Sequence, residues 1–451
     1  MPGGFAARES ALAAPFPDKL SALRAAFSGM MKALFQEQSS SLRISILAEP
    51  AAQSFISAHA ATLDSAFQTV PMSDVMRQRL QRSDYIFSGI KAFHELNEAF
   101  PSLIDENGNR KPFERFLNDV QAIDKTYNQN YLRAEYNFVA SSATMAAKWE
   151  EYAEDGDRYN LQYRTAKDSR VRPEHAALHG VTLPMSDPFW ESYYPPNGWN
   201  CRCTVVQVRK SKYPTTPHDE AMALGEAATQ SDKRGIFRFN PGIEQKAVPD
   251  YNPYTISRCR NCPVAKDTSS LSAMSVPGGF VAGINTLAAD IPSNELCQAC
   301  RLLHECAADK EKSQSAIERK HYLHEMEHLL NLKEVLPIGN GGETIKVGFK
   351  KFGNEHLYSD TFGRSKALTK EDLKDLNLLL RRATFISDSA LSHAQKHDIV
   401  HFYYYQVELR GKTIRLNVAK QEWRKKNGRI KTDYVLYSIN DIKKENTEGD
   451  S

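Results

Sequence analysis

Two cysteine pairs are spaced as metal ligands in the middle of the 451-residue chain. Cys259 and Cys262 form one CxxC pair, and 34 residues separate it from the second pair, Cys297 and Cys300. Four thiolates can surround a zinc ion tetrahedrally, and such a shell leaves no open position for a substrate. The gap is longer than in short zinc ribbons, and free or redox-active thiols are the alternative. We predict a structural zinc ion that staples a segment poor in large apolar residues.

A second group of ligand-type side chains lies within residues 162–206, where charges, aromatic residues and two close cysteines alternate with prolines and glycines. The candidate ligands are Asp168, His175, His179, Cys201 and Cys203. Carboxylate, imidazole and thiolate groups all bind zinc. Alternatively, Asp168 and the neighbouring arginines form a hydrogen-bonded network, and the cysteines are small buried apolar groups. The sequence leaves both interpretations open.

An HExxH pattern occupies residues 324–328. On a helix, His324 and His328 lie one turn apart, and Glu325 is placed to act as a general base in a zinc peptidase. A peptidase also needs a third ligand and a strand that holds the substrate. His321 is the conceivable third ligand, but it lies on the same helix. The alternative is a charged linker helix in which histidine and glutamate recur on a solvated face.

The elements that position these residues fall into a helical first half and a mixed second half. Apolar residues recur at helical spacing over residues 19–37, 51–67 and 75–100, and then over 124–151. Ser73 and Asp74 are the candidate N-caps of the third helix, and Pro101 is expected to end it. The last of these helices is apolar on two sides, which indicates packing between neighbours rather than a docking face for another subunit. Next we expect a small α+β cap: a strand at 161–165, a short helix at 173–178 and a strand after Cys203.

The C-terminal part reads as an α+β domain with an antiparallel sheet. A strand over 344–349 precedes a helix over 370–382, for which Thr369 and Asp372 form a capping-box-like pair. A β-hairpin follows, with strands at 401–409 and 413–418 around a turn containing Gly411. A final strand covers 434–439. A helix followed by a sheet of this kind is typical of the α+β class.

Composition is that of a globular protein, with 41% hydrophobic and 25% charged residues and a formal net charge of +3. Residues 341–451 hold 21 Lys and Arg against 15 Asp and Glu, a basic balance compatible with a nucleic-acid substrate or with an ordinary solvated surface. We expect no membrane span, no signal peptide and a cytoplasmic protein in which seven cysteines favour metal or free thiols over disulfides. The predicted segments are 1–89 (helical), 90–209 (helix and cap), 210–308 (loop-rich with the CxxC pairs), 309–333 (helical linker) and 334–445 (C-terminal domain).

Residues 165–203 resemble the head-morphogenesis domain of phage Mu F-like minor head proteins. The resemblance rests on Thr165, on the run Asp168-Ser169-Arg170-Val171-Arg172, on His175 and Gly180, and on the string PPNGWNCRC at 195–203; it extends more loosely back to Ile90. It implies a minor capsid or head-morphogenesis component that contacts portal or capsid subunits. Such a protein is expected in the host cytoplasm during assembly and then in the virion.

The C-terminal domain resembles phage-associated nucleases of the barnase, EndoU, colicin and RelE group, in element order and scattered polar residues over 336–440. The resemblance implies metal-independent RNA cleavage, which needs a base, an acid and a cation for the phosphorane charge. The candidate residues are His356, His397 (or His401), Arg415 and Ser438. The strand period predicts that Arg415 and Asn417 share one face of their strand, and that Tyr434, Leu436 and Ser438 share one face of the last strand. Alternatively, the histidines are surface residues and Arg415 pairs with a carboxylate. Two further readings of the whole chain are a stand-alone ribonuclease with an adaptor region and the zinc peptidase described above.

Overall fold

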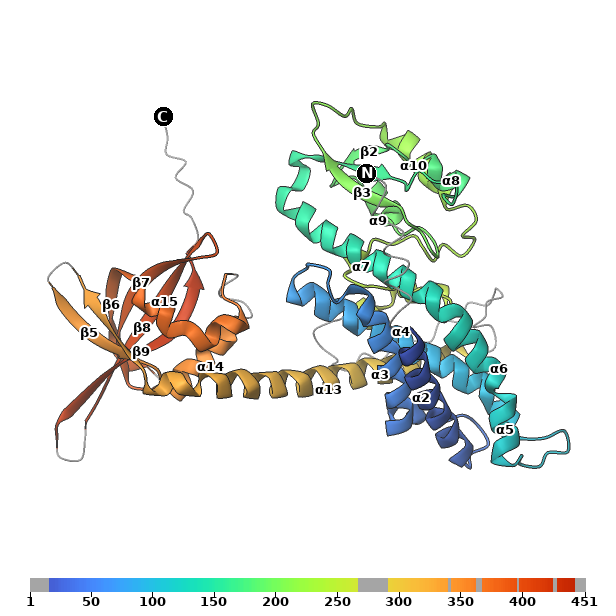
Figure 1. Cartoon of the computed structure of the whole chain (residues 1–451), viewed down its shortest axis with the longest axis horizontal. Helices are drawn as coiled ribbons and strands as arrows, with labels where there is room; N and C mark the ends of the chain where they lie inside the picture. The colour runs from blue at the N-terminus through green and yellow to red at the C-terminus, as the bar shows by residue number, and fades with distance from the viewer. Residues whose placement is uncertain are drawn as a thin grey trace. The chain divides into compact units, whose positions relative to one another are not determined.

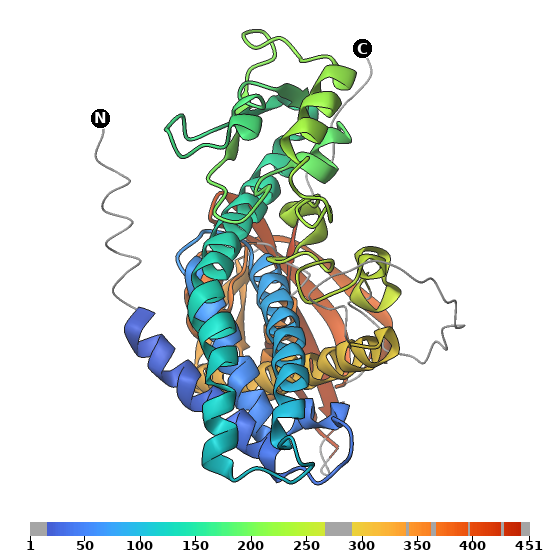
Figure 2. The same ribbon diagram turned by 90° about the vertical axis from the view of Figure 1, so that its right-hand side faces the viewer.

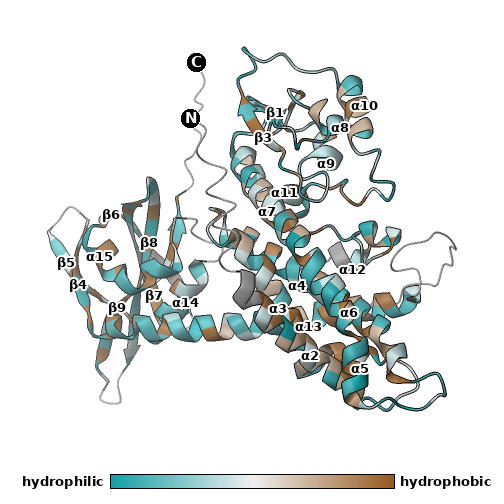
Figure 3. Cartoon of the chain, turned by 45° about the vertical axis from the view of Figure 1, so that its right-hand side comes forward, coloured by the Kyte–Doolittle hydropathy of each residue, from teal (hydrophilic) through white to brown (hydrophobic). Residues whose placement is uncertain are grey.

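The structure is a computed structural model that describes residues 16–266, 291–339, 342–361, 367–395, 397–424 and 428–442. The chain divides into two compact units, Met1–Asp309 and Lys310–Ser451 (Figures 1 and 2). Helix α13 (Ser293–Glu325) has residues in both units and is mostly hydrophilic along its length (Figure 3). The predicted α+β class is confirmed, with a helical N-terminal region and a C-terminal sheet. The finer boundaries predicted within the first unit stay predictions.

The N-terminal helices pack around one large apolar core. They are α2 (Phe16–Gln36), α3 (Pro50–Asp64), α4 (Asp74–Ala99), α5 (Phe113–Asp119), α6 (Gln121–Ile123), a π-helical segment (Asp124–Tyr131) and α7 (Leu132–Asp155). Helix α4 begins after Ser73, whose hydroxyl accepts a hydrogen bond from the amide of Met76 at 3.1 Å, so the predicted N-cap is confirmed. Pro101 follows the helix shortly after its end, as expected.

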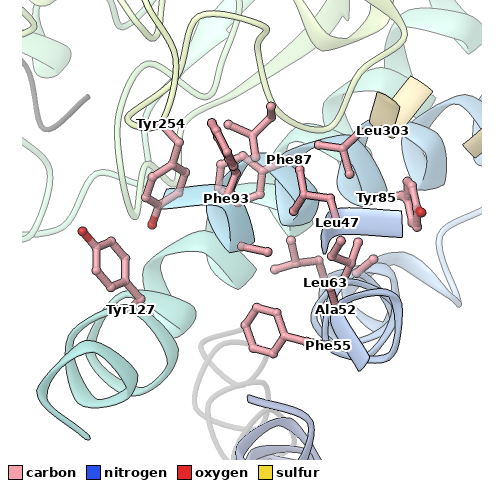
Figure 4. Packing of buried hydrophobic residues seen from close by; sticks show 14 of the residues in the cluster. Leu47, Ala52, Phe55, Leu63, Tyr85, Phe87, Phe93, Tyr127, Tyr254 and Leu303 are labelled. Carbon is pink, nitrogen blue, oxygen red and sulfur yellow. The ribbon is translucent and has the colours of Figure 1, made fainter. Parts of the chain in front are cut away.

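The same core takes in distant parts of the chain (Figure 4). Leu303 of α13 packs so closely on Gly89 of α4 that an added Cβ would lie 2.3 Å from its Cδ2 atom. Tyr254, from the loop-rich stretch, is also buried in this core. Helix α7 contributes side chains to this core on one side and to a separate core on another, so the prediction that its two apolar sides pack within the molecule is confirmed.

The helical core also contains buried charges. The ammonium of Lys91 donates hydrogen bonds to the carboxylate of Glu135 (2.7 Å) and to the carbonyl oxygen of Tyr127 (2.8 Å), and it lies 3.1 Å from Nε2 of His59. Tyr254 donates to the other carboxylate oxygen of Glu135 at 2.8 Å. Lys91, Glu135 and His59 are at most 3% exposed. We call these five residues the Lys91 network.

The predicted α+β cap sits on the end of α7. Its sheet has the order β2-β1-β3 and is antiparallel, with Tyr163 opposite Val205. The strands are β1 (Asn160–Arg164), β2 (Thr182–Pro184) and β3 (Thr204–Val208). The helices are α8 (Pro173–Ala176), α9 (Phe189–Tyr193), α10 (His218–Ala228), α11 (Pro241–Glu244) and, near the first CxxC pair, α12 (Pro263–Lys266). The core of the cap is aromatic, with Trp190 and Tyr194 fully buried.

The C-terminal unit contains a six-stranded sheet of order β4-β5-β9-β8-β7-β6. The strands are β4 (Lys333–Ile338), β5 (Glu343–Gly348), β6 (Thr384–Gln395), β7 (Ile399–Leu409), β8 (Lys412–Arg424) and β9 (Ile430–Asp441). All neighbouring pairs are antiparallel except β5 and β9, which are parallel. The prediction of an antiparallel sheet therefore needs this correction at one pair. The hairpin turn falls at Arg410 and Gly411, both with positive φ.

Three helical segments accompany this sheet. The predicted helix over 370–382 is a 3-10 segment (Lys370–Asp375) followed by α15 (Leu376–Arg381), and its capping box between Thr369 and Asp372 is present. Helix α14 (Lys351–Asp360), which the sequence analysis did not predict, carries His356. Its packing against β9 is close, because a Cβ on Gly353 would lie 2.7 Å from the carbonyl oxygen of Leu436. The core of this unit is formed by α14, α15 and one face of the sheet.

Candidate functional site

The polar centre of the cap is a group of three ligand-type side chains. Nδ1 of His175 lies 3.8 Å from Sγ of Cys201 and 3.9 Å from Sγ of Cys203. The three residues are 3%, 4% and 8% exposed, and their ligand atoms all lie within 4.8 Å of one another. Among the described residues this is the one group of three or more His, Cys, Asp or Glu side chains that meets this criterion. We call it the His-Cys-Cys cluster.

Local backbone structure brings these side chains together. Pro173 begins the short helix α8, which fits its fixed φ, and the buried His175 follows two residues later. Asn200 has a positive φ of 57°, a conformation that asparagine tolerates better than most residues, and it redirects the chain just before Cys201. Residues two apart in a strand-like segment share a side. Cys201 and Cys203 therefore point inward together, and the intervening Arg202 does not.

Arg202 instead pairs with Asp168 at the surface of the cap. Two hydrogen bonds of 2.6 Å join its guanidinium to both carboxylate oxygens. The hydrogen bonds from Arg202 lower the pKa of Asp168 to about 2. Nδ1 of His179 accepts a hydrogen bond from the amide of Thr165 at 3.1 Å, and burial lowers the pKa of this imidazole. Of the five residues considered as a metal shell, three converge, whereas Asp168 and His179 have other partners.

The two thiols of the cluster differ in electrostatics. The hydrogen bond from Cys203 lowers the pKa of Cys201 well below its usual range, with a further contribution from the hydrogen bond to His175. The hydrogen bond between the two thiols raises the pKa of Cys203, and burial raises it further. Tyr163, fully buried beside them, donates its hydroxyl hydrogen to Oδ1 of Asn197 at 2.9 Å. Two sulfur atoms beside one ring nitrogen are an arrangement that can accept a cation.

The four cysteines of the CxxC pairs line one cavity of about 590 Å³ in the N-terminal unit, together with His304. Burial raises the pKa of Cys259 to about 11 and that of Cys300 to about 12, and the neighbouring thiols add to both shifts. Nη2 of Arg258 lies 2.9 Å from Sγ of Cys297. The sulfur atoms are thus neighbours, but no three of them lie close enough to form a shell in the described part of the chain. Most of the insert predicted over 267–293 lies outside the described residues, and the zinc ion stays a prediction.

The HExxH residues do not share one helical face in the structure. Helix α13 ends at Glu325, and a 3-10 segment (Met326–Asn331) follows. His324 lies 3.2 Å from the carboxylate of Glu327, while Nδ1 of His328 contacts the carbonyl oxygen of Glu325 at 2.7 Å. All four residues are exposed. This geometry favours the charged linker over a peptidase centre.

The candidate nuclease residues of the C-terminal unit lie on or beside the sheet face that is turned away from its core. Ile414, Leu416 and Val418 of β8 point into the core, so Arg415 and Asn417 point to the opposite face, as predicted. The guanidinium of Arg415 lies 5.0 Å from the ring centre of Tyr404, and its buried Nε lacks a hydrogen-bond partner among the described residues.

A β-bulge in β9 turns Ser438 to this face and places Tyr437 in contact with His356. Asn417 pairs with Ser438 and Val418 pairs with Leu436, so Tyr437 is an extra residue in β9. The Nδ2 of Asn417 donates to the hydroxyl of Ser438 at 2.7 Å. The prediction that Tyr434, Leu436 and Ser438 share a face is therefore wrong. It assumed an uninterrupted period of two, and the bulge shifts Ser438 to the face of Asn417.

Tyr437, which the sequence analysis did not single out, connects the candidates. Its hydroxyl lies 2.8 Å from Nε2 of His356, and its ring lies 5.8 Å from that of Phe402. His397 instead stacks on Phe352 at 4.4 Å, and His401 pairs with Asp388 at 2.7 Å. Nothing in the strand period marks Tyr437, because its position depends on the bulge. His356, Arg415 and Ser438 thus belong to one continuous set of contacts, while His401 is engaged elsewhere.

Comparison with known proteins assigns one segment of the chain. Residues 102–206 match the family model described as "Phage Mu protein F like protein". This segment begins shortly after α4, ends within β3, and contains the His-Cys-Cys cluster. It is a type of domain found in phage proteins. More particularly, the chain carries a Phage Mu protein F-like domain, as the resemblance of its motifs implied.

Individual relatives agree with this assignment. The "Putative capsid assembly protein F" of Escherichia phage Mu is 38% identical over 104 residues, which are 23% of this chain and 21% of that protein. The "Mu-like prophage FluMu F protein" of Haemophilus influenzae is 37% identical over 100 residues, 20% of this chain and 24% of that protein. The chain thus spans less than a quarter of the length of these relatives. No solved structure matches.

Proposed function

We propose that the protein is a minor capsid or head-morphogenesis component that acts through protein–protein contacts during assembly of a phage head. The observation that carries the proposal is the Mu F-like domain at residues 102–206, together with the relative from phage Mu whose name states capsid assembly. Its partners would be portal or capsid subunits, first in the host cytoplasm and then in the virion. Among the described helices, none combines the length and apolar character of a membrane span.

Particle composition tests this proposal. The gene would be removed from the phage or prophage that encodes it and restored as the wild type or as Trp190→Ala, which empties a fully buried position of the cap. We expect head yield to fall on removal and to recover with the wild type only, and purified particles to contain the chain. Arg202→Ala, at the surface of the same cap, is the matched control and should restore the yield. Normal heads that lack the chain would reject the proposal.

We further propose that the C-terminal unit cleaves RNA without a metal ion. The observation that favours it is the shared sheet face of Arg415, Ser438 and, through Tyr437, His356. Arg415 is partly exposed on this face, where its guanidinium lies 5.0 Å from the ring centre of Tyr404, and a guanidinium is a donor suited to phosphate oxygens. His356 would move the proton of the 2′-hydroxyl group, oriented by Tyr437, and Arg415 would stabilise the developing negative charge.

The nuclease proposal is tested with the purified full chain, labelled RNA and excess chelator. His356→Ala and Arg415→Ala should each lower the cleavage rate by about 10²-fold or more, the usual contribution of one acid–base or charge-stabilising group. His321→Ala, an exposed histidine of α13, is the matched control and should cleave normally. Cleavage that survives both substitutions would show that the residues are assigned wrongly, and an inactive wild type would reject the activity.

A structural zinc ion held by Cys259, Cys262, Cys297 and Cys300 is also proposed. Support comes from the arrangement of all four thiols around one cavity. The four thiolates would have to approach one another further than they do here, and metal binding would supply the driving force. Metal analysis of the reduced chain tests it: a wild type without zinc would reject this site.

A further inference from the structure

We propose that the His-Cys-Cys cluster at the centre of the cap is a second metal centre, in which Nδ1 of His175 and the sulfur atoms of Cys201 and Cys203 bind a zinc-type divalent cation. This site is separate from the four-cysteine cavity, with which it shares no residue. It also lies inside the matched domain, whereas the CxxC pairs lie outside it. The inference does not depend on the function proposed for the whole chain.

The distances in the cluster are close to those of a coordination shell. Bonds of about 2.0 Å to nitrogen and about 2.3 Å to sulfur at a tetrahedral angle place the nitrogen and sulfur atoms about 3.5 Å apart. The structure has 3.8 Å and 3.9 Å for the two pairs. The two N–S separations therefore exceed those of a bound ion by only a few tenths of an ångström, and all three ligand atoms lie within 4.8 Å of one another.

The contacts bring three ligand atoms to one point. Both sulfur atoms approach the same ring nitrogen of His175, and the two thiols also contact each other. A cation at the meeting point would bind all three atoms at once. Two thiolates and one imidazole form a borderline-soft donor set of the kind that zinc takes.

Burial explains what the ion would do for the fold. The three ligands come from two segments, the short helix α8 and the stretch before β3, and their side chains are nearly inaccessible. A metal ion would fix α8 to the aromatic loop that ends at Cys203. Three protein ligands leave one coordination position, which water or a group from another molecule can fill.

The test compares metal content between variants of the reduced full chain after dialysis against a weak chelator. If both centres are loaded, the wild type should hold two equivalents of zinc. Cys201→Ser and His175→Ala should each lose one equivalent, and Cys259→Ser should lose the other. Cys306→Ser, a cysteine outside both sets of ligands, is the matched control and should lose none. Metal content unchanged in Cys201→Ser would overturn the proposal.

A second measurement tests the proposal even if substitutions in the cap prevent folding. The chain that carries Cys259→Ser and Cys297→Ser keeps an unaltered cap. Cobalt(II) added to this chain should bind at one equivalent and give thiolate-to-cobalt absorption with a tetrahedral spectrum. X-ray absorption should then show about two sulfur ligands per metal ion, as a two-thiolate shell requires. The absence of cobalt absorption in a folded protein would overturn the proposal, and so would a disulfide between Cys201 and Cys203 found in the wild type by mass spectrometry.

Discussion

The two buried polar clusters of the N-terminal unit are built on different principles. In the Lys91 network a charged donor meets several acceptors: the ammonium of Lys91 contacts Glu135, Tyr127 and His59 within 3.1 Å. In the His-Cys-Cys cluster, by contrast, two sulfur atoms lie nearly 4 Å from one nitrogen atom. The first cluster pairs its charged groups with protein groups. The second gathers three metal-ligand atoms, and this contrast is the reason for proposing an ion there.

Charge balance distinguishes the two clusters as well. Although burial by itself raises the pKa of Glu135, Lys91 and His59 lower it to about 2, so this carboxylate stays ionised. Burial lowers the pKa of His59 to about 4, and this imidazole stays neutral. The carboxylate of Glu135 therefore faces the Lys91 nitrogen at 2.7 Å. In the cap, the charge of Arg172 acts on Cys203, whereas Arg202 points away to Asp168.

The largest expected effect comes from breaking the Lys91 network. Lys91→Met would leave the carboxylate of Glu135 buried without its cation. We expect the free energy of unfolding of the N-terminal unit, measured by urea titration, to fall by about 3–5 kcal/mol, as on removal of one partner of a buried ion pair. Lys320→Met, at an exposed position of α13, should stay within about 0.5 kcal/mol of the wild type. If Lys91→Met lost no more unfolding free energy than Lys320→Met, the buried carboxylate of Glu135 would not depend on Lys91.

The second effect depends on pH and concerns Glu95, which lies next to this network. Burial raises its pKa to about 8, so the folded state keeps a proton that the unfolded state releases near pH 4.5. Stability should therefore fall as pH rises between these two values, by about 1.4 kcal/mol per pH unit for this group. Glu95→Gln should remove that part of the slope. Urea titrations of both proteins at pH 5, 6 and 7 measure it, and parallel curves would contradict the assignment.

Sequence patterns predicted those features that depend on neighbours in the chain. The N-cap Ser73, the capping box of Thr369 and the turn at Gly411 follow from local chemistry, and they are present. The cap was also recognisable, because its PPNGWNCRC string is compositionally unusual. Its strands and short helix fall within a few residues of the predicted bounds.

Features that depend on tertiary contacts could not be predicted in this way. His175 meets Cys201 across a sequence separation of 26 residues, and the sequence left Asp168 and His179 as equal candidates. Lys91 and Glu135 look like ordinary polar positions of helices, since no pattern reports that their side chains are buried. Helix α14 was missed because its ten residues carry few apolar side chains at helical spacing. The bulge at Tyr437 breaks the strand period without a glycine or proline to mark it.

The third effect is the response to metal, which should occur in one cluster only. A ligand that binds only the folded state at a free concentration of 100 times its dissociation constant stabilises it by about 2.7 kcal/mol. Zinc at that excess should therefore raise the free energy of unfolding of the chain carrying Cys259→Ser and Cys297→Ser, which has only the cap site. Adding Cys201→Ser should abolish the response. An equal response in both proteins would place the ion elsewhere.

The smallest effect is expected at the surface of the cap, where Arg202 and Asp168 form an ion pair with two short hydrogen bonds. Both side chains are partly exposed, at 29% and 39%, so water competes for each charge and salt screens the pair. Arg202→Ala should therefore cost at most about 1 kcal/mol of unfolding free energy, and less at high salt. The substitution should also leave zinc binding intact, because Arg202 points away from the thiols. A larger loss, or a loss of zinc with it, would mean that Arg202 positions Cys201 and Cys203 for the ion rather than merely covering them.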